Sequence, residues 1–468
     1  VCPARVPRRE RCVFFRTAAE AEKGGFRACF RCRPELAPGA APVDAVSRLV
    51  RDAAARIEAG YLQERSVEAL AAELGVTSRH LRRTVEAELG VSPLELEETR
   101  RLALAKQLLT DTALPVTEIA YAAGFGSLRR FHDVFRARFQ RPPSALRKRT
   151  APREAGSTFP VRLTARRPFA AAPLLAFLKA RTIAGVEEVE GSVYRRTISL
   201  GGQTGWLAAT LDEGGVTAHV SLSLAPRLAE IVARLRRLFD LDADPAAIDG
   251  HLRQDALLAA GVEARPGMRI PGAFDPFEVA VRAVLGQQIS VAAASTLAGR
   301  LGARFGTKVT GGPAPLGSVF PSATTLAAVP ASAVAELGMP ASRAATVVAL
   351  AKAVAEGHVH LEEASEATLE RLVALPGIGP WTCAYLALRV FRWPDAFPAG
   401  DLALQRALGA RSSREADERA RPWSPFRSYA ALHLWASLAD GDLPHDAPSP
   451  PRRPRAPLAP RAAAPRRR

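Results

Sequence analysis

Two glycines interrupt a helical pattern in the stretch Leu375-Pro376-Gly377-Ile378-Gly379-Pro380-Trp381. Apolar residues recur at helical spacing before this stretch, and after it we expect a second helix that begins near Trp381 and carries Tyr385. Gly377 and Gly379 let the backbone approach another chain closely, and the N–H groups that open the second helix have no intrahelical acceptors. The pattern predicts a helical hairpin whose backbone binds a phosphate, with a plain turn between helices as the alternative.

Further blocks of sequence surround the hairpin. They are Phe274-Asp275-Pro276-Phe277-Glu278, Gly286-Gln287-Gln288-Ile289-Ser290, Phe397-Pro398-Ala399-Gly400-Asp401, Arg427-Ser428-Tyr429-Ala430 and His433-Leu434-Trp435. With the hairpin, these blocks resemble the helix-hairpin-helix DNA glycosylases, specifically the bacterial 3-methyladenine glycosylase II of the AlkA type, over about Ser157 to Asp446. The resemblance implies hydrolysis of the bond between an alkylated base and deoxyribose in double-stranded DNA, which leaves an abasic site.

Asp401 is the candidate catalytic carboxylate. Breaking the bond between base and sugar builds positive charge on the sugar, and a nearby carboxylate stabilises that charge and can orient or deprotonate water. Asp401 lies after Pro398-Ala399-Gly400 and before Leu402, so it is also a good helix N-cap. Both roles are compatible, because capping fixes the carboxylate while one oxygen faces the substrate. The resemblance places the family's catalytic aspartate at Asp401.

Three aromatic residues are expected to form the base pocket. A damaged base inside a duplex has to be flipped out before it can be reached. Trp381 and Tyr385 are four residues apart and share one helical face, and the resemblance adds Trp435. Alkylation at a ring nitrogen makes a purine cationic, and electron-rich rings bind cations with about 0.5–2 kcal/mol each. A cationic base is already a good leaving group, so no general acid is required. Core packing is the alternative for Tyr385 and Trp435, and Leu402, where a relative can carry another aromatic, leaves the selectivity open.

Gln288 lies where the family places the wedge that fills the space of the flipped base, with a buried polar cap between helices as the alternative. Strand-cleaving relatives carry a lysine at the position of Trp381 for Schiff-base chemistry, and others bind an iron–sulfur cluster through four cysteines after the catalytic region. This sequence has neither feature, because a tryptophan occupies position 381 and Cys383 is its last cysteine. The resemblance therefore implies a monofunctional glycosylase that needs no cofactor for catalysis. It also implies a monovalent cation at the hairpin, held by carbonyls around Val373, Leu375 and Gly377.

The segment from about Val43 to Arg149 carries two helix-turn-helix patterns separated by a long helix. In the first pattern, Ser66 can cap one helix, Gly75-Val76-Thr77 makes the turn, and Ser78 can cap the second helix. In the second pattern, the turn Gly124-Phe125-Gly126-Ser127 precedes a helix with apolar residues on its inner face.

Arginines gather on the outer faces of the second helix of each pattern. They are Arg79, Arg82, Arg83, Arg129 and Arg130. With the motif Gly124-Phe125-x-Ser127-x3-Phe131-x3-Phe135, the segment resembles the AraC-type DNA-binding domain. The resemblance implies two recognition helices in neighbouring major-groove segments of double-stranded DNA at promoter-like sites. A helical bundle with a solvated arginine face is the alternative.

Three cysteines, Cys2, Cys29 and Cys32, have the spacing of most of a tetrahedral zinc site. The residues around them resemble the zinc-binding methyl-acceptor domain of the Ada family, whose reactive cysteine lies a few residues before the position of Cys2. The chain begins after that position. Either its start is assigned too far downstream or the reactive ligand is lost, and we do not expect methyl transfer. Cys12 is a candidate fourth ligand, with packing behind Phe14-Phe15 as the alternative.

The composition agrees with a multi-domain DNA-binding protein. The chain has 468 residues, 48% hydrophobic residues and a formal net charge of +17, which favours a polyanionic partner. No uncharged apolar run approaches the ~20 residues of a membrane span, and no leader pattern opens the sequence. We therefore expect a cytoplasmic protein with no membrane partner.

The predicted fold is multi-domain and mostly α, with a small α+β domain between the helix-turn-helix pair and the helix-hairpin-helix glycosylase. Alternating runs at Val193–Leu200, Gly205–Leu211 and Val216–Leu222 predict an antiparallel sheet, flanked by helices at Pro173–Arg181 and Leu228–Leu238. The predicted domains are a partial zinc-binding segment at 1–38, the double helix-turn-helix at 43–149, the α+β domain at 157–243, the glycosylase domain at 244–446 and a disordered basic tail at 447–468.

The fusion admits more than one interpretation. The favoured one is a glycosylase joined to a sequence-specific regulatory module. A second is a transcriptional regulator of the alkylation response whose glycosylase half is secondary or a sensor, and promoter-specific binding would favour it. In a third, the N-terminal half only adds DNA affinity, and undiminished activity with weaker binding after deletion of residues 1–150 would favour that.

Overall fold

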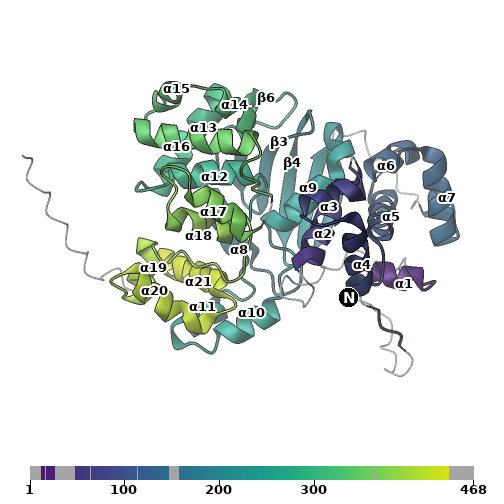
Figure 1. Cartoon of the computed structure of the whole chain (residues 1–468), viewed down its shortest axis with the longest axis horizontal. Helices are drawn as coiled ribbons and strands as arrows, with labels where there is room; N and C mark the ends of the chain where they lie inside the picture. Colours follow the sequence, from purple (N-terminus) through teal and green to yellow (C-terminus); the bar gives the residue numbers. More distant parts are fainter. Residues whose placement is uncertain are drawn as a thin grey trace, which may run out of the picture.

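The computed structural model describes residues 12–15, 17–26, 48–58, 60–63, 65–112, 114–146, 158–362 and 364–441. The predicted zinc cysteines Cys2, Cys29 and Cys32 and the predicted tail at 447–468 lie outside these residues. Helices dominate the described part, and a five-stranded antiparallel sheet lies between two groups of helices (Figure 1). The predicted fold class is therefore confirmed.

The N-terminal group is entirely helical in its described part. Its elements are α1 (Ala18–Lys23), α2 (Arg48–Glu58), η3 (Tyr61–Gln63), α3 (Val67–Glu73), α4 (Ser78–Leu89), α5 (Pro93–Asp111), α6 (Val116–Ala122), α7 (Leu128–Phe139) and η4 (Pro143–Leu146). The first helix-turn-helix is formed by α3 and α4 and the second by α6 and α7. The long helix α5 separates them, as the sequence predicts.

Side-chain caps fix where these helices begin. Ser66 caps α3 by accepting a hydrogen bond from the Ala69 N–H at 3.2 Å, as predicted. The prediction that Ser78 caps α4 is wrong. Thr77 has the extended cap conformation, its hydroxyl accepts from the His80 N–H at 3.2 Å, and Ser78 is the first residue of the helix. Both hydroxyls have the chemistry of a cap, so sequence alone could not separate them.

The central sheet has the strand order β1-β5-β4-β3-β2. Its strands are β1 (Thr158–Thr164), β2 (Glu187–Glu190), β3 (Val193–Leu200), β4 (Gln203–Asp212) and β5 (Gly215–Ser221). The sequence patterns predict β3, β4 and β5 but not the two edge strands. Strand β1 contains Pro160 and β2 is short and acidic. Both features weaken a strand signal, and both are tolerated at a sheet edge because one side of an edge strand has no partner.

The remaining elements are again mostly helical. They are α8 (Ala171–Lys179), η5 (Leu222–Arg227), α9 (Leu228–Leu238), α10 (Pro245–Leu252), α11 (Ala256–Ala264), α12 (Pro276–Leu285), α13 (Val291–Phe305), β6 (Thr307–Lys308), β7 (Ser318–Val319), α14 (Ala323–Ala327), α15 (Ala331–Ala335), α16 (Ala341–Ala355), α17 (Glu366–Val373), α18 (Pro380–Arg389), α19 (Leu402–Leu408), α20 (Ser413–Ala420), η6 (Arg421–Trp423) and α21 (Arg427–Asp440). Within the described ranges, no helix is both long enough and apolar enough to span a bilayer.

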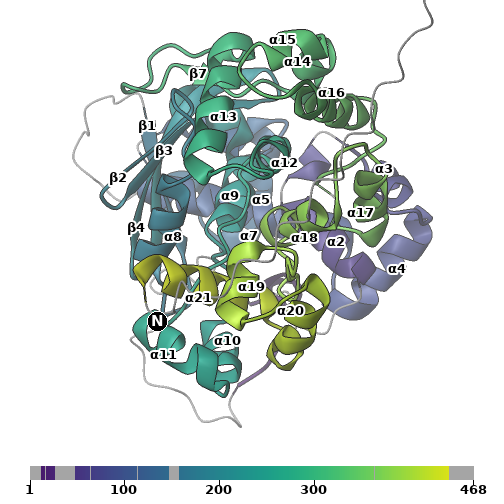
Figure 2. The same cartoon turned by 90° about the vertical axis from the view of Figure 1, so that its left-hand side faces the viewer.

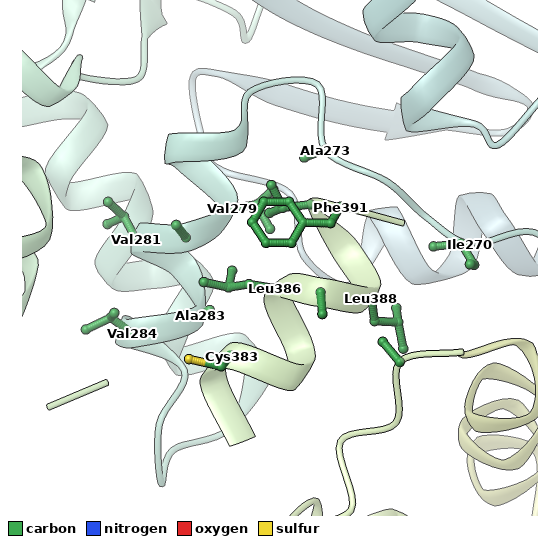
Figure 3. Close-up of a cluster of buried hydrophobic side chains, with 14 of the residues drawn as sticks. Ile270, Ala273, Val279, Val281, Ala283, Val284, Cys383, Leu386, Leu388 and Phe391 are labelled. Atoms are coloured by element: carbon green, nitrogen blue, oxygen red, sulfur yellow. The ribbon is translucent and has the colours of Figure 1, made fainter. Parts of the chain in front are cut away.

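The core of this C-terminal group forms where α12 packs against α18. Figure 3 shows Val281 and Val284 of α12 in the same cluster as Cys383 and Leu386 of α18. Three of these side chains are completely buried and Cys383 is 8% exposed. Burial of this apolar surface holds α18 in place, and with it the glycine hairpin from which α18 starts.

A second hydrophobic cluster joins the N-terminal helices to the sheet. Leu108 of α5 shares this cluster with Phe159 and Val161 of β1. Beside them, the Gln107 side chain donates to the Arg162 carbonyl at 2.9 Å. The helix-turn-helix group is therefore packed directly against the sheet (Figure 1).

Candidate active site

The glycine hairpin joins α17 to α18, which begins at Pro380, one residue before the predicted start. Gly377 has a φ of +83°, a left-handed conformation that favours glycine. Gly379 is the N-cap of α18 and has no side chain that could satisfy the first N–H groups of the helix. A Cβ at Gly379 would meet nothing within 4 Å, so the space beside the start of the helix is open to a phosphate.

The loop between α12 and α13 is fastened to this hairpin. Gln287 donates from Nε2 to the Gly377 carbonyl at 2.8 Å and to the Thr382 hydroxyl at 3.0 Å. Arg343 of α16 donates to the Gln287 carbonyl at 2.5 Å. The next residue, Gln288, is exposed and has a left-handed φ of +58°. Gln288 is therefore not a buried polar cap, and its half-buried neighbour Gln287 makes the contacts between this loop and the hairpin.

Asp401 caps α19 and accepts four hydrogen bonds. Its Oδ1 accepts from the N–H groups of Ala403 and Leu404 at 3.0 and 3.1 Å. The indole Nε1 of Trp435 donates to the same oxygen at 3.2 Å, and that of Trp381 donates to Oδ2 at 3.3 Å. The carboxylate is thus held by its own helix and by two aromatic side chains.

Two of the three predicted aromatic residues bond this carboxylate, and the third, Tyr385, stacks on Trp381. The rings of Trp381 and Tyr385 stack with their centroids 5.4 Å apart and their planes at 15°. Trp435 approaches from α21, and Figure 2 shows α18, α19 and α21 gathered on one side of the molecule. All three side chains are half-buried, although Tyr385 and Trp435 also pack against the core. Leu402 is 60% exposed and its side chain adds no aromatic surface.

An arginine cluster that the sequence does not reveal lies on the side of Tyr385 that faces Arg389. Arg389 is buried and donates to the Tyr385 hydroxyl at 2.8 Å. The guanidinium carbon of Arg389 lies 4.8 Å from the Phe177 ring centroid, and that of Arg181 lies 3.6 Å from the same centroid. Burial raises the pKa of Tyr385, but the positive charges of Arg389, Arg181 and Arg282 outweigh burial and lower this pKa to about 8.

Buried ion pairs join the sheet to the helices behind the site. Arg196 of β3 pairs with Glu278 of α12 at 2.9 Å, and Arg282 pairs with Glu187 of β2 at 3.2 Å. Burial raises the pKa of Glu278 to about 7, with the positive charge of Arg196 acting in the opposite direction. Glu278, which belongs to the Phe274–Glu278 block of the sequence, therefore takes part in an ion pair that joins the sheet to α12.

The predicted DNA-binding arginines are all exposed. They are Arg79, Arg82 and Arg83 on α4 and Arg129 and Arg130 on α7. Arg82 pairs with Glu68 at 2.7 Å, but both side chains are more than half exposed. Solvent screens such a pair, so Arg82 can exchange Glu68 for a DNA group at little cost.

The described residues contain no group of three or more His, Cys, Asp or Glu side chains that could hold a metal ion. The three predicted zinc cysteines lie outside those residues. Cys12, the candidate fourth ligand, is half-buried, and the neighbouring Phe14 is 75% exposed.

Four known domain families match the chain. Residues 1–35 match the metal binding domain of Ada, 70–149 a helix-turn-helix domain, 160–275 the AlkA N-terminal domain and 281–421 the HhH-GPD superfamily of base excision DNA repair proteins.

Individual proteins are similar over long stretches. The chain is 40% identical over 448 residues to a probable bifunctional transcriptional activator/DNA repair enzyme AlkA of Mycobacterium tuberculosis, a match that covers 93% of this chain and 90% of that protein. It is 38% identical over 266 residues to the DNA-3-methyladenine glycosylase 2 of Escherichia coli, covering 56% of this chain and 92% of that protein. The structure of a 3-methyladenine DNA glycosylase from Archaeoglobus fulgidus superposes with a TM-score of 0.53 at 24% identity, covering 59% of this chain and 98% of that chain, which shows a shared fold.

Proposed function

This chain belongs to the family that joins an AraC-type helix-turn-helix module to an AlkA-type 3-methyladenine DNA glycosylase, and from that premise we propose that Asp401 is the catalytic carboxylate of its glycosylase reaction. Trp381, Tyr385 and Trp435 form the pocket that receives the flipped base. The substrates are alkylated bases such as 3-methyladenine and 7-methylguanine in double-stranded DNA, and the product is an abasic site.

One observation carries this proposal. Two indole N–H groups, from Trp381 and Trp435, donate to the carboxylate of Asp401, so the aromatic faces and the negative charge occupy one site. A cationic base stacks on electron-rich rings, and the carboxylate stabilises the positive charge that develops on the sugar. Oδ1 already accepts three hydrogen bonds, whereas Oδ2 accepts one within the described structure. Oδ2 is therefore the oxygen that faces the sugar and the attacking water.

The bond between base and sugar breaks with both electrons leaving on the base. A base that carries a positive charge departs as a neutral molecule, so the site needs no group that donates a proton. Water adds to the sugar cation, and Asp401 orients that water and accepts the proton that it loses, which then passes to solvent. Trp381 stands where strand-cleaving relatives place a lysine, so the reaction ends at the abasic site.

The hairpin and the Gln288 loop hold the DNA. A phosphate oxygen accepts from the N–H groups that begin α18, beside Gly377 and Gly379. The exposed Gln288 side chain enters the duplex where the flipped base was stacked. Gln287 bonds the Gln288 loop to the Gly377 carbonyl, so the wedge and the phosphate grip keep a constant separation.

Base release from methylated duplex DNA tests the function. We expect the purified chain to release 3-methyladenine and 7-methylguanine in the presence of a metal chelator and without nucleotide. Neither cleavage of the bond between base and sugar nor addition of water requires a metal in the proposed reaction. Chromatography identifies the free bases, and a separate assay counts abasic sites. Release of no methylated base, or strand cleavage at the same rate as release, would contradict the proposal.

The helix-turn-helix module binds promoter-like sites through its two recognition helices, α4 and α7. Arg79, Arg82 and Arg83 on α4 and Arg129 and Arg130 on α7 supply the contacts, because all five are exposed.

We expect selection from random duplex DNA to enrich a motif with two segments about one helical turn apart. Arg82→Ala or Arg129→Ala should relax that motif, at a cost of about 1–3 kcal/mol for a lost base contact. Base release from short lesion duplexes should stay nearly unchanged, since Asp401 lies on other elements. If no motif emerges and the variants only reduce the salt dependence of binding, these arginines form a general phosphate-binding face.

Metal binding is a further part of the proposal. Zinc binds Cys2, Cys29 and Cys32, supported by their spacing and by the match of residues 1–35 to the metal binding domain of Ada. The monovalent cation at the hairpin uses carbonyls around Val373, Leu375 and Gly377. Two of these carbonyls already accept hydrogen bonds, from Ile378 and Gln287, and each keeps a second lone pair.

A transcriptional regulator whose glycosylase half is a sensor is the second candidate function. The shared core of the helix-turn-helix group and the sheet favours it, because a change in either half can be transmitted through packed side chains. Promoter binding that changes when a lesion occupies the Asp401 site would support this candidate. In either case the substrate is DNA, so we propose action in the cytoplasm.

A further inference from the structure

Phe177 of α8 and Arg181 of the turn after α8 lie next to Arg389, the arginine that bonds Tyr385. The Phe177 ring lies in cation–π contact with both Arg181 and Arg389. Arg389 bonds the Tyr385 hydroxyl, and Tyr385 stacks on Trp381. A continuous row of contacts thus leads from Asp401 through Trp381, Tyr385, Arg389 and Phe177 to Arg181.

The three guanidinium groups of this cluster differ in how their charge is compensated. Arg282 pairs with Glu187 at 3.2 Å. Arg389 is buried, and it donates to the carbonyls of Pro271 and Gly272 and to the Tyr385 hydroxyl.

Arg181 is different. It is half-buried, and it donates to the Phe177 carbonyl of its own turn at 3.3 Å. In the part of the chain that the structure describes, no carboxylate lies within ion-pair distance of it. Arg181 therefore carries a positive charge beside the Phe177 ring. A bound anionic or electron-rich group can compensate that charge.

The pKa of Tyr385 responds to the positive charges of the same arginines. Arg389, Arg181 and Arg282 together lower its pKa to about 8 in spite of burial. The end of the aromatic row next to Arg181 therefore favours negative charge, whereas the end next to Asp401 favours positive charge. The stacked rings of Trp381 and Tyr385, which form part of the proposed base pocket, lie between these two ends.

We propose that Arg181 is a specificity-determining residue, which promotes release of neutral damaged bases and does not assist release of cationic ones. This inference rests on the proposed function of the Asp401 site. A neutral base such as hypoxanthine leaves with both bonding electrons and so becomes an anion, which the Arg181 guanidinium stabilises. Water adds to the sugar, and its proton ends on the released base. A cationic base such as 7-methylguanine leaves as a neutral molecule and gains nothing from Arg181.

The test compares two lesions in one duplex sequence, hypoxanthine and 7-methylguanine, with the full chain under single-turnover conditions. Arg181→Gln keeps a hydrogen-bond donor but removes the charge. We expect hypoxanthine release to fall on the order of a hundredfold, as when one donor to a developing anion is removed. Release of 7-methylguanine should be unchanged or faster. Arg181→Lys restores the charge and should recover part of the hypoxanthine activity.

A matched control and a second readout separate this role from a structural one. Arg304→Gln removes another arginine that lies beside a phenylalanine, 5.7 Å from the Phe305 ring centroid, and should change neither rate. The ultraviolet absorbance of phenolate should show one tyrosine that titrates near pH 8 in the wild type and at higher pH in Arg181→Gln. Tyr385→Phe should remove that transition.

Several outcomes would overturn the inference. Equal losses on both lesions, with weaker salt dependence of binding, would mean that Arg181 contacts a DNA phosphate. Wild-type release of 7-methylguanine without hypoxanthine release would refute the role of Arg181, and so would hypoxanthine release that Arg181→Gln leaves unchanged. Neither outcome would affect the proposed glycosylase function. If the wild type releases neither base, the proposed function fails as well.

Discussion

Asp401→Asn should abolish base release, with a single-turnover rate at least about a hundredfold below that of the wild type. The substitution keeps the size of the side chain, and its amide oxygen can still accept from the Ala403 and Leu404 N–H groups that Asp401 caps. What it removes is the negative charge that faces the sugar cation. Binding of a lesion duplex should therefore survive, and the measurement pairs product release with a binding isotherm on the same DNA.

The structure supplies a matched control for this experiment. Asp255 also caps a helix, accepting from the Leu257 N–H at 2.9 Å, and its other oxygen accepts from the Trp423 indole at 2.8 Å. Asp255→Asn therefore makes the same chemical change in a similar setting at a different place. It should leave base release intact. Full activity of Asp401→Asn would remove Asp401 from the mechanism, and equal losses in both variants would indicate a structural effect of capping aspartates.

The hairpin and its carboxylate could be predicted because their signals are local. Glycines at 377 and 379 interrupt a helical pattern, and Asp401 follows a Pro-Ala-Gly turn before a new helix. Trp381 and Tyr385 lie on one helical face, so their stacking also follows from spacing within one segment. Trp435 lies on another element, and only the family resemblance placed it beside Asp401.

The arginine cluster could not be predicted from the sequence. Arg181 is one of 64 lysines and arginines, and it ends a predicted helix at a position that looks solvated. Its neighbours Tyr385 and Arg389 follow more than two hundred residues later, so no periodicity connects them. Contacts of this kind depend on how the sheet packs against the helical core. The edge strand β1 shows the same limit, because Pro160 obscures a strand that pairing with β5 stabilises.

The orientation of the two tryptophans also emerges only in three dimensions. Sequence predicts ring faces that stack on a cationic base, but the structure shows the indole edges of Trp381 and Trp435 donating to Asp401. Each tryptophan therefore has two separable contributions, its aromatic face and its N–H group. The face binds positive charge, and the N–H group orients the carboxylate.

Trp381→Ala and Trp435→Ala should each slow release of 7-methylguanine more than release of hypoxanthine. Cation–π attraction is lost only for the charged base, and its loss corresponds to about 0.5–2 kcal/mol. Loss of the N–H donor to Asp401 should slow release of both bases to a similar extent. Rates for the two lesions in one duplex sequence give the difference directly.

Trp381→Phe separates the two contributions, because it keeps an aromatic face and removes the N–H donor to Oδ2 of Asp401. We expect this variant to lose activity on both lesions equally while preserving the preference for the cationic base. Trp206→Ala is the control, since Trp206 is also half-buried and its indole donates to the Gly311 carbonyl at 3.0 Å in a contact that includes no site residue. Equal losses on both lesions in Trp381→Ala and Trp435→Ala would mean that these rings contribute only shape or packing. A cation–π role requires release of the cationic base to slow more than release of the neutral one.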